Sequence, residues 1–396
     1  MADVSETGPK VPVLFLNSPE SFGADTFIQA LLMRHLEPRF EVHAACPADT
    51  PSWAALSKIP NVQLRPTSFG PSLTSNTSRL ARAVGLLPAL VDLLALARYV
   101  REHRIQILHA SDRPRDAVTC AALARLTGAR AVIHLHVKYD DWIGAPVRWA
   151  LRRADALIGV SAFVSRSLVA KGYRAERVHT VLNAIDPADW DFRCDPAPVR
   201  AELGLPARAK VILCVARLFH WKGQRELLQA AALVRRELPD LQLLIVGAED
   251  AVAGGPRYLE ELRALVGKLD LSAHVRFLGK RDDVARLMAA ADLFCLPSFE
   301  EPFGLVYAEA MAMKRPVVGL DNGGTPEVVE QGETGLLVRP GEPGEIEELA
   351  ASLARLLRDP ALRTRFGEAG RHRVEQLFSP RQLATAMAAV YDQLPR

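Results

Sequence analysis

The sequence predicts an α/β protein made of two Rossmann-like, doubly wound domains that face each other across a cleft. The chain has 396 residues, and single hydrophobic cores stop growing at about 250–300 residues, so two domains are expected. Short apolar runs alternate with stretches of helical periodicity in both halves, which is typical of repeated βαβ units. A proline-containing, charged stretch over residues 187–209 separates the two halves.

The first half contains seven runs of buried-strand type, most of them separated by helical stretches. Periodicity predicts helices over residues 26–36, 115–127 and 145–153. The strand candidates are residues 11–17, 40–46, 62–67, 105–111, 129–137, 154–161 and 178–185. This order predicts a parallel sheet with helices on its faces.

The same rhythm restarts at residue 210. The strand candidates of this half are residues 210–216, 241–247, 275–279, 293–298, 315–320 and 335–340. The predicted helices are residues 224–236, 257–269, 283–291, 305–313, 344–357, 360–377 and 380–393. We therefore expect an N-terminal domain over residues 1–190, a linker over 191–209 and a C-terminal domain over 210–379.

Composition agrees with a globular protein and disfavours several other classes. Apolar residues make up 49% of the chain and charged residues 24%, both ordinary values. A formal net charge of +3 is too small to indicate a nucleic-acid partner by itself, and we expect none. The cysteines are odd in number and form no C-x-x-C pair, which favours reduced, mostly buried thiols over disulfides or a zinc site.

Two segments bear on the membrane and on localisation. The N-terminus, MADVSETGPK, is polar and has no apolar signal core, so a cytoplasmic protein is expected. Residues 83–100 form the most apolar long run, but Pro88, Asp92 and Arg98 interrupt it. We predict a buried amphipathic helix there and not a membrane span.

Several common catalytic motifs are missing. The loop after the first strand, NSPESFGADTF, has a single glycine, Gly23, and no G-x-G-x-x-G, which disfavours a dinucleotide oxidoreductase. There is no P-loop, no G-x-S-x-G and no H-E-x-x-H. The triplet Asp189-Trp190-Asp191 could hold a divalent metal, but it lies in the predicted linker, so we expect no metal site.

A basic loop follows the first strand of the second half. In CVARLFHWKG, Arg217 and Lys222 stand between the end of that strand and the start of a helix. Two cations beside the positive end of a helix dipole suit a diphosphate. A solvated basic turn is the alternative.

Two carboxylates bracket a tight turn in PSFEEPFGLVYAEAMAM. Glu301 precedes the turn, and Glu309 lies a little over one turn into the following helix among small and apolar residues. The backbone amides of Phe303, Gly304 and Leu305 point freely from the start of that helix. Carboxylates and free amides suit hydroxyl groups or phosphate, whereas one structural and one solvated glutamate is the alternative.

Histidines end two strands of the first half. His134 and His136 lie on the same side of the strand at 129–137, so the later one is the better candidate to reach a site. A structural hydrogen-bonding role is the alternative, and it applies equally to His109.

Together these segments resemble the retaining glycosyltransferases of family four, which have the GT-B fold. The resemblance rests on ILHASD, IHLH, ADALIGVSAFVSRSLVAKG and VLNAID in the first half, and on CVARLFHWKG in the second. The stretch PSFEEPFGLVYAEAMAMKRPVVGLDNGGTPEVVEQGETGLLV resembles the signature segment of that family, including two glutamates separated by seven residues. The match covers nearly the whole chain.

The resemblance implies roles for individual residues. Glu309 would bind the ribose hydroxyls of a nucleotide, and Glu301 would bind hydroxyls of the transferred sugar with the amides of the turn. Arg217 and Lys222 would hold the diphosphate. Gly23 would let the first loop approach that diphosphate, and His136 would lie near the sugar. The N-terminal domain would bind the acceptor, the C-terminal domain would bind the nucleotide sugar, and the last helix, within 380–396, would pack back on the N-terminal domain.

The implied reaction is retaining and metal-independent, with a nucleotide sugar as co-substrate and no further cofactor. A UDP-sugar is expected ahead of a GDP-sugar. Three departures from the family pattern occur: the first loop lacks two adjacent glycines, and Ala184 and Lys314 stand where glycine is usual.

The acceptor is left open as a glycan, a lipid-linked sugar or a small molecule such as a natural-product precursor. Its contacts are expected from loops 18–26, 68–80 and 137–146. A basic face of Arg79, Arg82, Arg148, Arg152 and Arg153 would suit peripheral docking at the inner face of an anionic membrane, with a solvated helix face as the alternative. Alternative functions are a sugar phosphorylase, a nucleotide-sugar epimerase or a non-catalytic sugar-binding protein.

Overall fold

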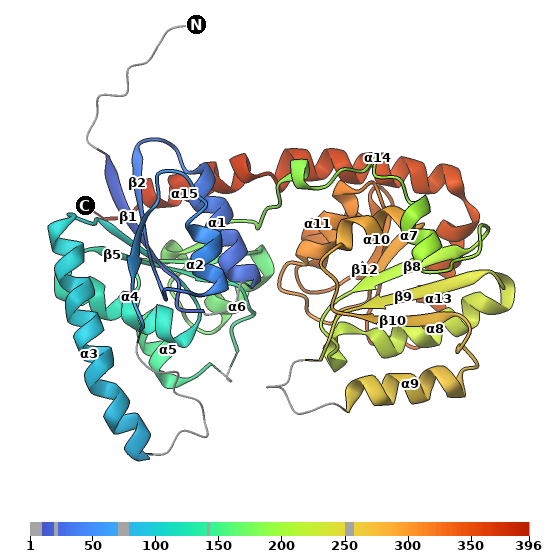
Figure 1. The fold of residues 1–396 in the computed structure, drawn as a ribbon, viewed down its shortest axis with the longest axis horizontal. Coiled ribbons are helices and arrows are strands. Elements are labelled where there is room, and N and C mark those ends of the chain that lie inside the picture. The colour runs from blue at the N-terminus through green and yellow to red at the C-terminus, as the bar shows by residue number, and fades with distance from the viewer. Residues whose placement is uncertain (1–9, 20–22, 70–78, 141–142, 250–256, 396) are drawn as a thin grey trace, which may run out of the picture. The chain divides into compact units, whose positions relative to one another are not determined.

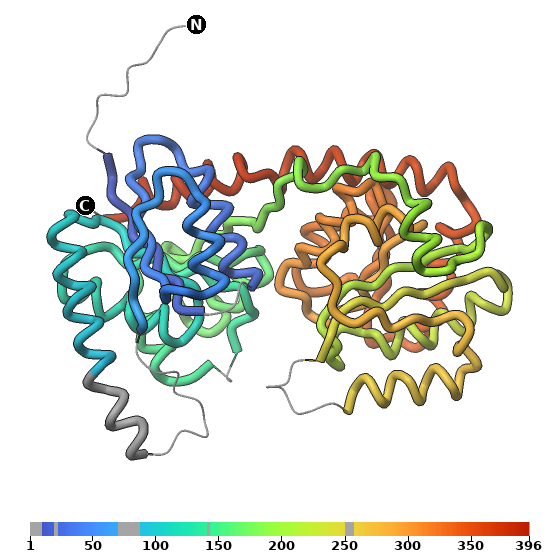
Figure 2. The backbone as a smooth tube through the Cα atoms, viewed as in Figure 1, coloured from blue at the N-terminus to red at the C-terminus, as the bar shows by residue number. Residues whose placement is uncertain are grey.

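The chain divides into two compact units. The computed structural model describes residues 10–19, 23–69, 79–140, 143–249 and 257–395, with the backbone alone described for residues 79–87 (Figures 1 and 2). Unit 1 comprises residues 1–184 and 380–396, and unit 2 comprises residues 185–379. Each of the three predicted acceptor loops includes residues outside this description, and the side chains of Arg79 and Arg82 also lie outside it.

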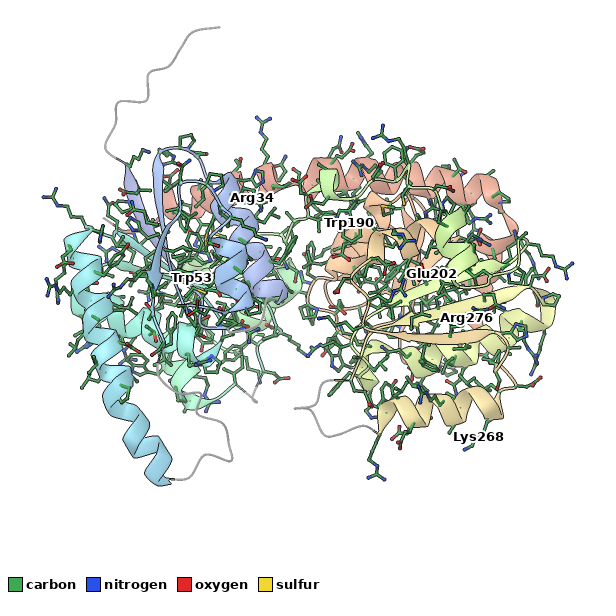
Figure 3. All side chains as sticks on the ribbon, viewed as in Figure 1. Arg34, Trp53, Trp190, Glu202, Lys268 and Arg276 are labelled. Carbon is green, nitrogen blue, oxygen red and sulfur yellow. The ribbon has the colours of Figure 1, made fainter. Side chains whose placement is uncertain are left out.

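Residues 185–209, most of which were expected to form a linker, group with unit 2. Arg371 of α14 (Pro360–Leu377) donates to the carbonyl oxygens of Pro187 and Trp190 at 3.2 and 3.1 Å. Arg200 of α7 (Ala197–Glu202) donates to the carbonyl oxygen of Ala290 at 2.8 Å. Figure 3 labels Trp190 in this segment. These part-buried guanidinium contacts tie the stretch to one unit.

The core of unit 1 is a parallel sheet with the strand order β3-β2-β1-β4-β5-β6-β7. The described strands are β1 (Val11–Leu16), β2 (Phe40–Cys46), β3 (Gln63–Pro66), β4 (Ile107–Ser111), β5 (Arg130–Leu135), β6 (Ala156–Gly159) and β7 (Val178–Thr180). In the register, Leu14 of β1 lies beside His43 of β2 on one side and Leu108 of β4 on the other. Both faces of the central strands are covered, so their apolar runs are almost continuously buried.

Helices cover both faces of this sheet. They are α1 (Ala24–His35), α2 (Pro51–Leu56), α3 (Arg79–Glu102), α4 (Pro114–Thr127), α5 (Ala145–Leu151), α6 (Ala162–Ala170), the 3₁₀ turn η1 (Ala175–Arg177) and α15 (Pro380–Asp392). Helices α3, α4 and α5 pack in a row, and α1 packs on α2 and α15. The prediction of a buried helix over 83–100 is right only for its last part: Leu96 and Val100 are buried, whereas Leu90, Val91 and Leu94 are about half exposed.

The last helix, α15, belongs to unit 1 although it follows unit 2 in the chain. Figure 2 shows this red segment beside the blue one that contains α1. Tyr391 hydrogen-bonds through its hydroxyl to Nδ1 of the buried His109 at 2.8 Å, and its ring lies edge-on to Phe40. Asp392 accepts two hydrogen bonds from Arg39 at 2.7 and 2.8 Å. The chain therefore returns to complete its first unit.

Unit 2 has a second parallel sheet, with the strand order β10-β9-β8-β11-β12-β13. Its strands are β8 (Lys210–Val215), β9 (Leu241–Val246), β10 (Val275–Gly279), β11 (Leu293–Leu296), β12 (Val317–Leu320) and β13 (Gly335–Val338). The remaining elements are η2 (Pro187–Asp189), η3 (His220–Lys222), α8 (Gln224–Glu237), α9 (Tyr258–Lys268), α10 (Val284–Ala290), α11 (Leu305–Ala312), α12 (Thr325–Val328) and α13 (Glu345–Arg358). The predicted α/β class with two parallel sheets is confirmed (Figure 1).

The cysteines are free thiols. Cys46, Cys120, Cys214 and Cys295 are buried, and Cys194 is partly exposed. Within the part of the chain that the structure describes, no helix combines the length and the apolar character needed to cross a bilayer.

Candidate active site

The predicted site residues other than Gly23 and His136 gather at one edge of the unit 2 sheet. The strand order reverses between β8 and β11, since β8 leads to β9 on one side and β11 leads to β12 on the other. Ligands of doubly wound sheets bind outside the carboxyl ends of the strands at such a switch point. Arg217 and Lys222 follow β8, and Glu301 follows β11. Glu309 lies on α11, the helix that this last loop enters.

Lys222 and Glu301 form a buried ion pair. The Lys222 ammonium lies 2.6 Å from Oε2 of Glu301, and the two side chains are 11% and 10% exposed. Burial lowers the pKa of Lys222, and the neighbouring carboxylate of Glu301 opposes that shift. The ammonium also lies 3.8 Å from the centre of the Trp221 ring. The sequence assigned Lys222 to the diphosphate and Glu301 to the sugar. In the structure the two side chains contact each other, and the contact fixes both.

Arg217 lines a hollow of about 450 Å³ at the carboxyl ends of β8, β9 and β10. Its backbone carbonyl accepts a hydrogen bond from Gln224 of α8 at 2.9 Å, which fixes the loop. Glu249, Lys280 and Arg281 are the other charged residues of the lining. Three of the four charged groups that line the hollow are therefore cations.

The turn before α11 presents free backbone donors. Gly304 precedes the helix with φ 90° and ψ 58°, a left-handed conformation, and a Cβ there would lie 2.5 Å from Cδ2 of Tyr307. Among the described residues, the amides of Phe303, Gly304 and Leu305 have no hydrogen-bond partner. Free amides at a helix start carry partial positive charge and accept an anion or a hydroxyl oxygen as ligand. Only glycine combines this conformation with this packing.

Glu309 is a carboxyl group without a partner. It forms no hydrogen bond or ion pair within the residues that the structure describes, and its neighbours Ala308 and Ala310 are buried. Burial raises the pKa of Glu309 to about 7. The Glu309 side chain is partly exposed, but largely buried carboxyl groups normally have hydrogen-bond partners, so this one is available to a ligand.

The loop after β12 supports the turn, a role that sequence reasoning missed. Gly324 donates from its amide to the carbonyl oxygen of Glu301 at 2.7 Å, and Asn322 Oδ1 accepts from the amide of Glu300 at 3.2 Å. Tyr307, fully buried, donates from its hydroxyl to the carbonyl oxygen of Leu296. The run DNGGTPE marks a tight loop in the sequence, but nothing in it indicates which turn the loop holds.

The two predicted residues of unit 1 lie at the carboxyl edge of the other sheet. Gly23 directly precedes α1, and His136 directly follows β5. Burial lowers the pKa of His136 to about 4, so its imidazole is neutral at pH 7. Its Nε2 atom is buried and has no partner among the described residues. His109, by contrast, is held by Tyr391, which fits the structural alternative.

The Asp189-Trp190-Asp191 triplet makes contacts of its own. The Asp191 carboxylate accepts from both the amide and Nε of Arg193 at 3.1 Å. In the described ranges there is no group of three or more histidine, cysteine, aspartate or glutamate side chains placed to hold a metal ion.

Family comparisons agree with this arrangement. Residues 23–189 match the model described as Glycosyltransferase Family 4, and residues 197–373 match the model described as Glycosyl transferases group 1. Fold and family together make the chain a glycosyltransferase of the GT-B type. It belongs to the group 1 glycosyl transferases.

Individual relatives cover most of the chain. It is 30% identical over 314 residues to N-acetyl-alpha-D-glucosaminyl L-malate synthase of Bacillus anthracis, covering 76% of this chain and 78% of that protein. It is 33% identical over 303 residues to the GDP-mannose-dependent alpha-(1-6)-phosphatidylinositol monomannoside mannosyltransferase of Mycolicibacterium smegmatis, covering 72% and 76%. The structure of Anabaena HepE in complex with UDP-glucose matches with a TM-score of 0.80 and 26% identity, covering 97% of this chain and all of that one.

Proposed function

We propose that this glycosyltransferase moves a sugar from a nucleoside diphosphate sugar to a hydroxyl acceptor, with retention of configuration and without a metal ion. The observation that carries the proposal is the unpartnered carboxyl of Glu309, which lies on the helix whose entry loop holds the Lys222–Glu301 pair. A hydroxyl-bearing ligand supplies the partners that Glu309 lacks, and a diphosphate suits the cations at the same edge. The complex of HepE with UDP-glucose is similar in fold.

Each donor-site residue of unit 2 has a role in this proposal. Glu309 accepts hydrogen bonds from the ribose hydroxyls. Glu301, held by Lys222, accepts from hydroxyls of the transferred sugar, and the amides from Phe303 to Leu305 donate to the sugar and the phosphate. Arg217 and Lys222 bind the diphosphate, and the remaining protons of the Lys222 ammonium are available for this contact.

The bond changes follow from these contacts. The bond from the anomeric carbon to the diphosphate oxygen breaks, and a bond from the same carbon to the acceptor oxygen forms on the same face. The proton of the acceptor hydroxyl passes to an oxygen of the leaving diphosphate. Cations and amides already in place stabilise the charge that develops on the leaving group. Glu301 is paired with Lys222, so we do not assign it as half of a glycosidase acid–base pair.

For the donor we propose a UDP-sugar ahead of a GDP-sugar. The relatives differ on this point: HepE binds UDP-glucose, whereas the mycobacterial relative is GDP-mannose-dependent. A thermal-shift screen of nucleotide sugars decides between them, since a ligand at 100 times its dissociation constant adds roughly 2.7 kcal/mol of stability. The acceptor hydroxyl would belong to a glycan, a lipid-linked sugar or a small molecule, and the protein would act in the cytoplasm.

The central test follows nucleotide release from donor alone, through slow hydrolysis. Replacing Arg217 or Lys222 by alanine should cost roughly 2–4 kcal/mol in the barrier, or about 30- to 900-fold in rate. Lys268→Ala is the matched control, because Lys268 is exposed on α9 (Figure 3). Unchanged turnover in both site variants would contradict the phosphate assignment.

Four further measurements test the remaining parts. Anomeric configuration of the product, read by NMR, tests retention. Activity in the presence of a strong chelator tests independence of metal. Dependence on inorganic phosphate would indicate a phosphorylase instead, and a changed sugar released without acceptor would indicate an epimerase.

A further inference from the structure

A second group of ionisable side chains, which includes His136, lies at the switch point of unit 1, on a different sheet from Arg217, Lys222, Glu301 and Glu309. The strand order reverses between β1 and β4, since β1 leads to β2 on one side and β4 leads to β5 on the other. Asp112 and Arg113 follow β4, His136 follows β5, and Asp25 lies in the first turn of α1 after β1. By the rule applied to unit 2, a ligand site is expected at this edge.

Arg113 and Asp25 neutralise each other. Nη2 of Arg113 donates to Oδ1 of Asp25 at 3.1 Å, and Nε donates to Oδ2. Burial opposes ionisation of Asp25, but Arg113 outweighs it and the pKa of Asp25 is lowered. Gly23 leaves room for the pair, since a Cβ there would lie 3.0 Å from Oδ1 of Asp25 and 3.5 Å from Nη2 of Arg113. The positive charge of the Arg113 guanidinium is thus already balanced by the Asp25 carboxylate.

Asp112 lacks such a partner. Its Oδ2 atom accepts a hydrogen bond from the amide of His136 at 3.3 Å, and it forms no ion pair among the residues described. Asp116, one turn further on, is the contrast: its carboxylate accepts from the amide of Ser18 and from the hydroxyl of Ser111, both at 2.9 Å. The Asp116 carboxylate therefore has its hydrogen-bond partners within unit 1, whereas the Asp112 carboxylate can accept further hydrogen bonds.

The histidines beside Asp112 provide an independent observation. His134 is fully buried, and neither of its ring nitrogens has a partner in the part of the chain that is described. Its ring centroid lies 4.5 Å from that of His136, whose Nε2 is also unpartnered. Buried polar atoms without partners are costly, so a ligand or water is expected to satisfy them.

The charges of this group select the chemistry of the ligand. A hydroxyl both donates and accepts hydrogen bonds, so it can donate to a carboxylate and accept from a neutral imidazole. A phosphate only accepts unless it is protonated, Asp112 would repel it, and the positive charge of Arg113 is already balanced by Asp25. The edge therefore complements an uncharged polyol better than an anion.

We propose that Asp112 binds a hydroxyl of the acceptor, with His136 beside it, and that the part of the acceptor recognised at this edge is a neutral polyhydroxylated ring. This inference rests on the proposed function. Asp112 is then a specificity-determining residue for the acceptor and has no part in holding the nucleotide.

The experiment measures nucleotide release from UDP-glucose, or the donor chosen by the thermal-shift screen, with and without added polyols. The probes are myo-inositol and methyl glucoside as neutral rings, and inositol phosphate as the anionic counterpart. The wild-type protein should release nucleotide faster with a neutral ring and form the glycoside, detected by mass spectrometry. Stimulation by the phosphate ester alone, or by none of the probes, overturns the inference.

Variants separate binding of the acceptor from the rest of the reaction. Asp112→Asn should lose roughly 10- to 100-fold more in kcat/KM for the polyol than in the rate of donor hydrolysis, mainly through KM. Asp112→Glu, which keeps a carboxylate, should recover part of the loss. Asp392→Asn is the control, since Asp392 contacts Arg39 just before β2, at the opposite edge of the sheet.

The outcomes distinguish the two proposals. If Asp112→Asn retains full stimulation by the polyol, the assignment of Asp112 is wrong and the proposed function stands. If it loses donor hydrolysis while its thermal melting is unchanged, Asp112 serves the donor and the inference is also wrong. If the wild-type protein turns over no nucleotide sugar at all, the proposed function fails, and the inference fails with it.

Discussion

Replacing Glu309 by glutamine should stabilise the protein and weaken nucleotide binding at the same time. The pKa of Glu309 in the folded protein is about 7, above its ordinary value of 4.5, because the carboxyl is buried. Folding therefore disfavours the ionised form. The contribution of this group to stability is intact below pH 4.5 and is lost as the pH rises through 7.

The size of the effect follows from the same shift. A rise in pKa from 4.5 to about 7 corresponds to about 3 kcal/mol at pH 8. The side chain keeps partial exposure, so we expect a gain of about 1–3 kcal/mol for Glu309→Gln at pH 8 and little change near pH 4.5. For a unit of this size, that is a rise in melting temperature of roughly 2–12 °C.

The assay compares thermal melting of the variant and the wild type at pH 5 and pH 8, and titrates nucleotide at pH 8. Loss of charge-assisted hydrogen bonds to the ribose should weaken nucleotide binding by roughly 10- to 100-fold. Glu260→Gln is the control, because Glu260 is exposed on α9. A difference in stability that is the same at both pH values, or absent at pH 8, would refute the argument that Glu309 is a desolvated, unpartnered carboxyl.

Two further predictions concern packing. Gly304→Ala should destabilise unit 2 by more than 2 kcal/mol and lower activity, because the added Cβ meets the Tyr307 ring at 2.5 Å. The control is Gly332→Ala, where φ is 78° and the space around the glycine is open. This control should cost only about 1 kcal/mol in denaturant unfolding. Tyr391→Phe should destabilise unit 1 by about 1–3 kcal/mol, because it removes the partner of a buried nitrogen of His109; an unchanged unfolding midpoint would show that the hydrogen bond contributes nothing.

The fold was predictable from the sequence because each buried strand is a nearly continuous apolar run and the helices place apolar residues at helical spacing. The prediction was weaker where contacts between residues distant in the chain determine how a segment packs. Residues 187–209 have the composition of a linker, yet Arg371, far along the chain, binds their carbonyl groups. Helix α3 has an apolar sequence, yet Leu90 and Leu94 are about half exposed, and no local pattern reveals that.

Parts of the candidate site could also be predicted from the local sequence pattern. Glu309 stood out because it lies among alanines and methionines, and its carboxyl indeed has no partner in the described residues. The Lys222–Glu301 contact joins residues far apart in sequence, so no spacing rule could reveal it.

Lys314 shows how packing accommodates an unexpected residue. It adopts φ 54° where glycine is usual, and its ammonium lies 3.9 Å from the Phe192 ring and 2.8 Å from Glu368. These contacts offset the conformational cost of a left-handed lysine.

The return of α15 to unit 1 has a consequence for folding on the ribosome. Unit 2 is one continuous segment, whereas unit 1 lacks its last helix until residues 185–379 have been synthesised. At roughly 5–20 residues per second, that interval lasts about 10–40 seconds. During it, the face that receives Tyr391, including His109 and Phe40, stays uncovered. We therefore expect the second half of the chain to reach its native state before the first, and nascent unit 1 to be the part that depends on chaperones.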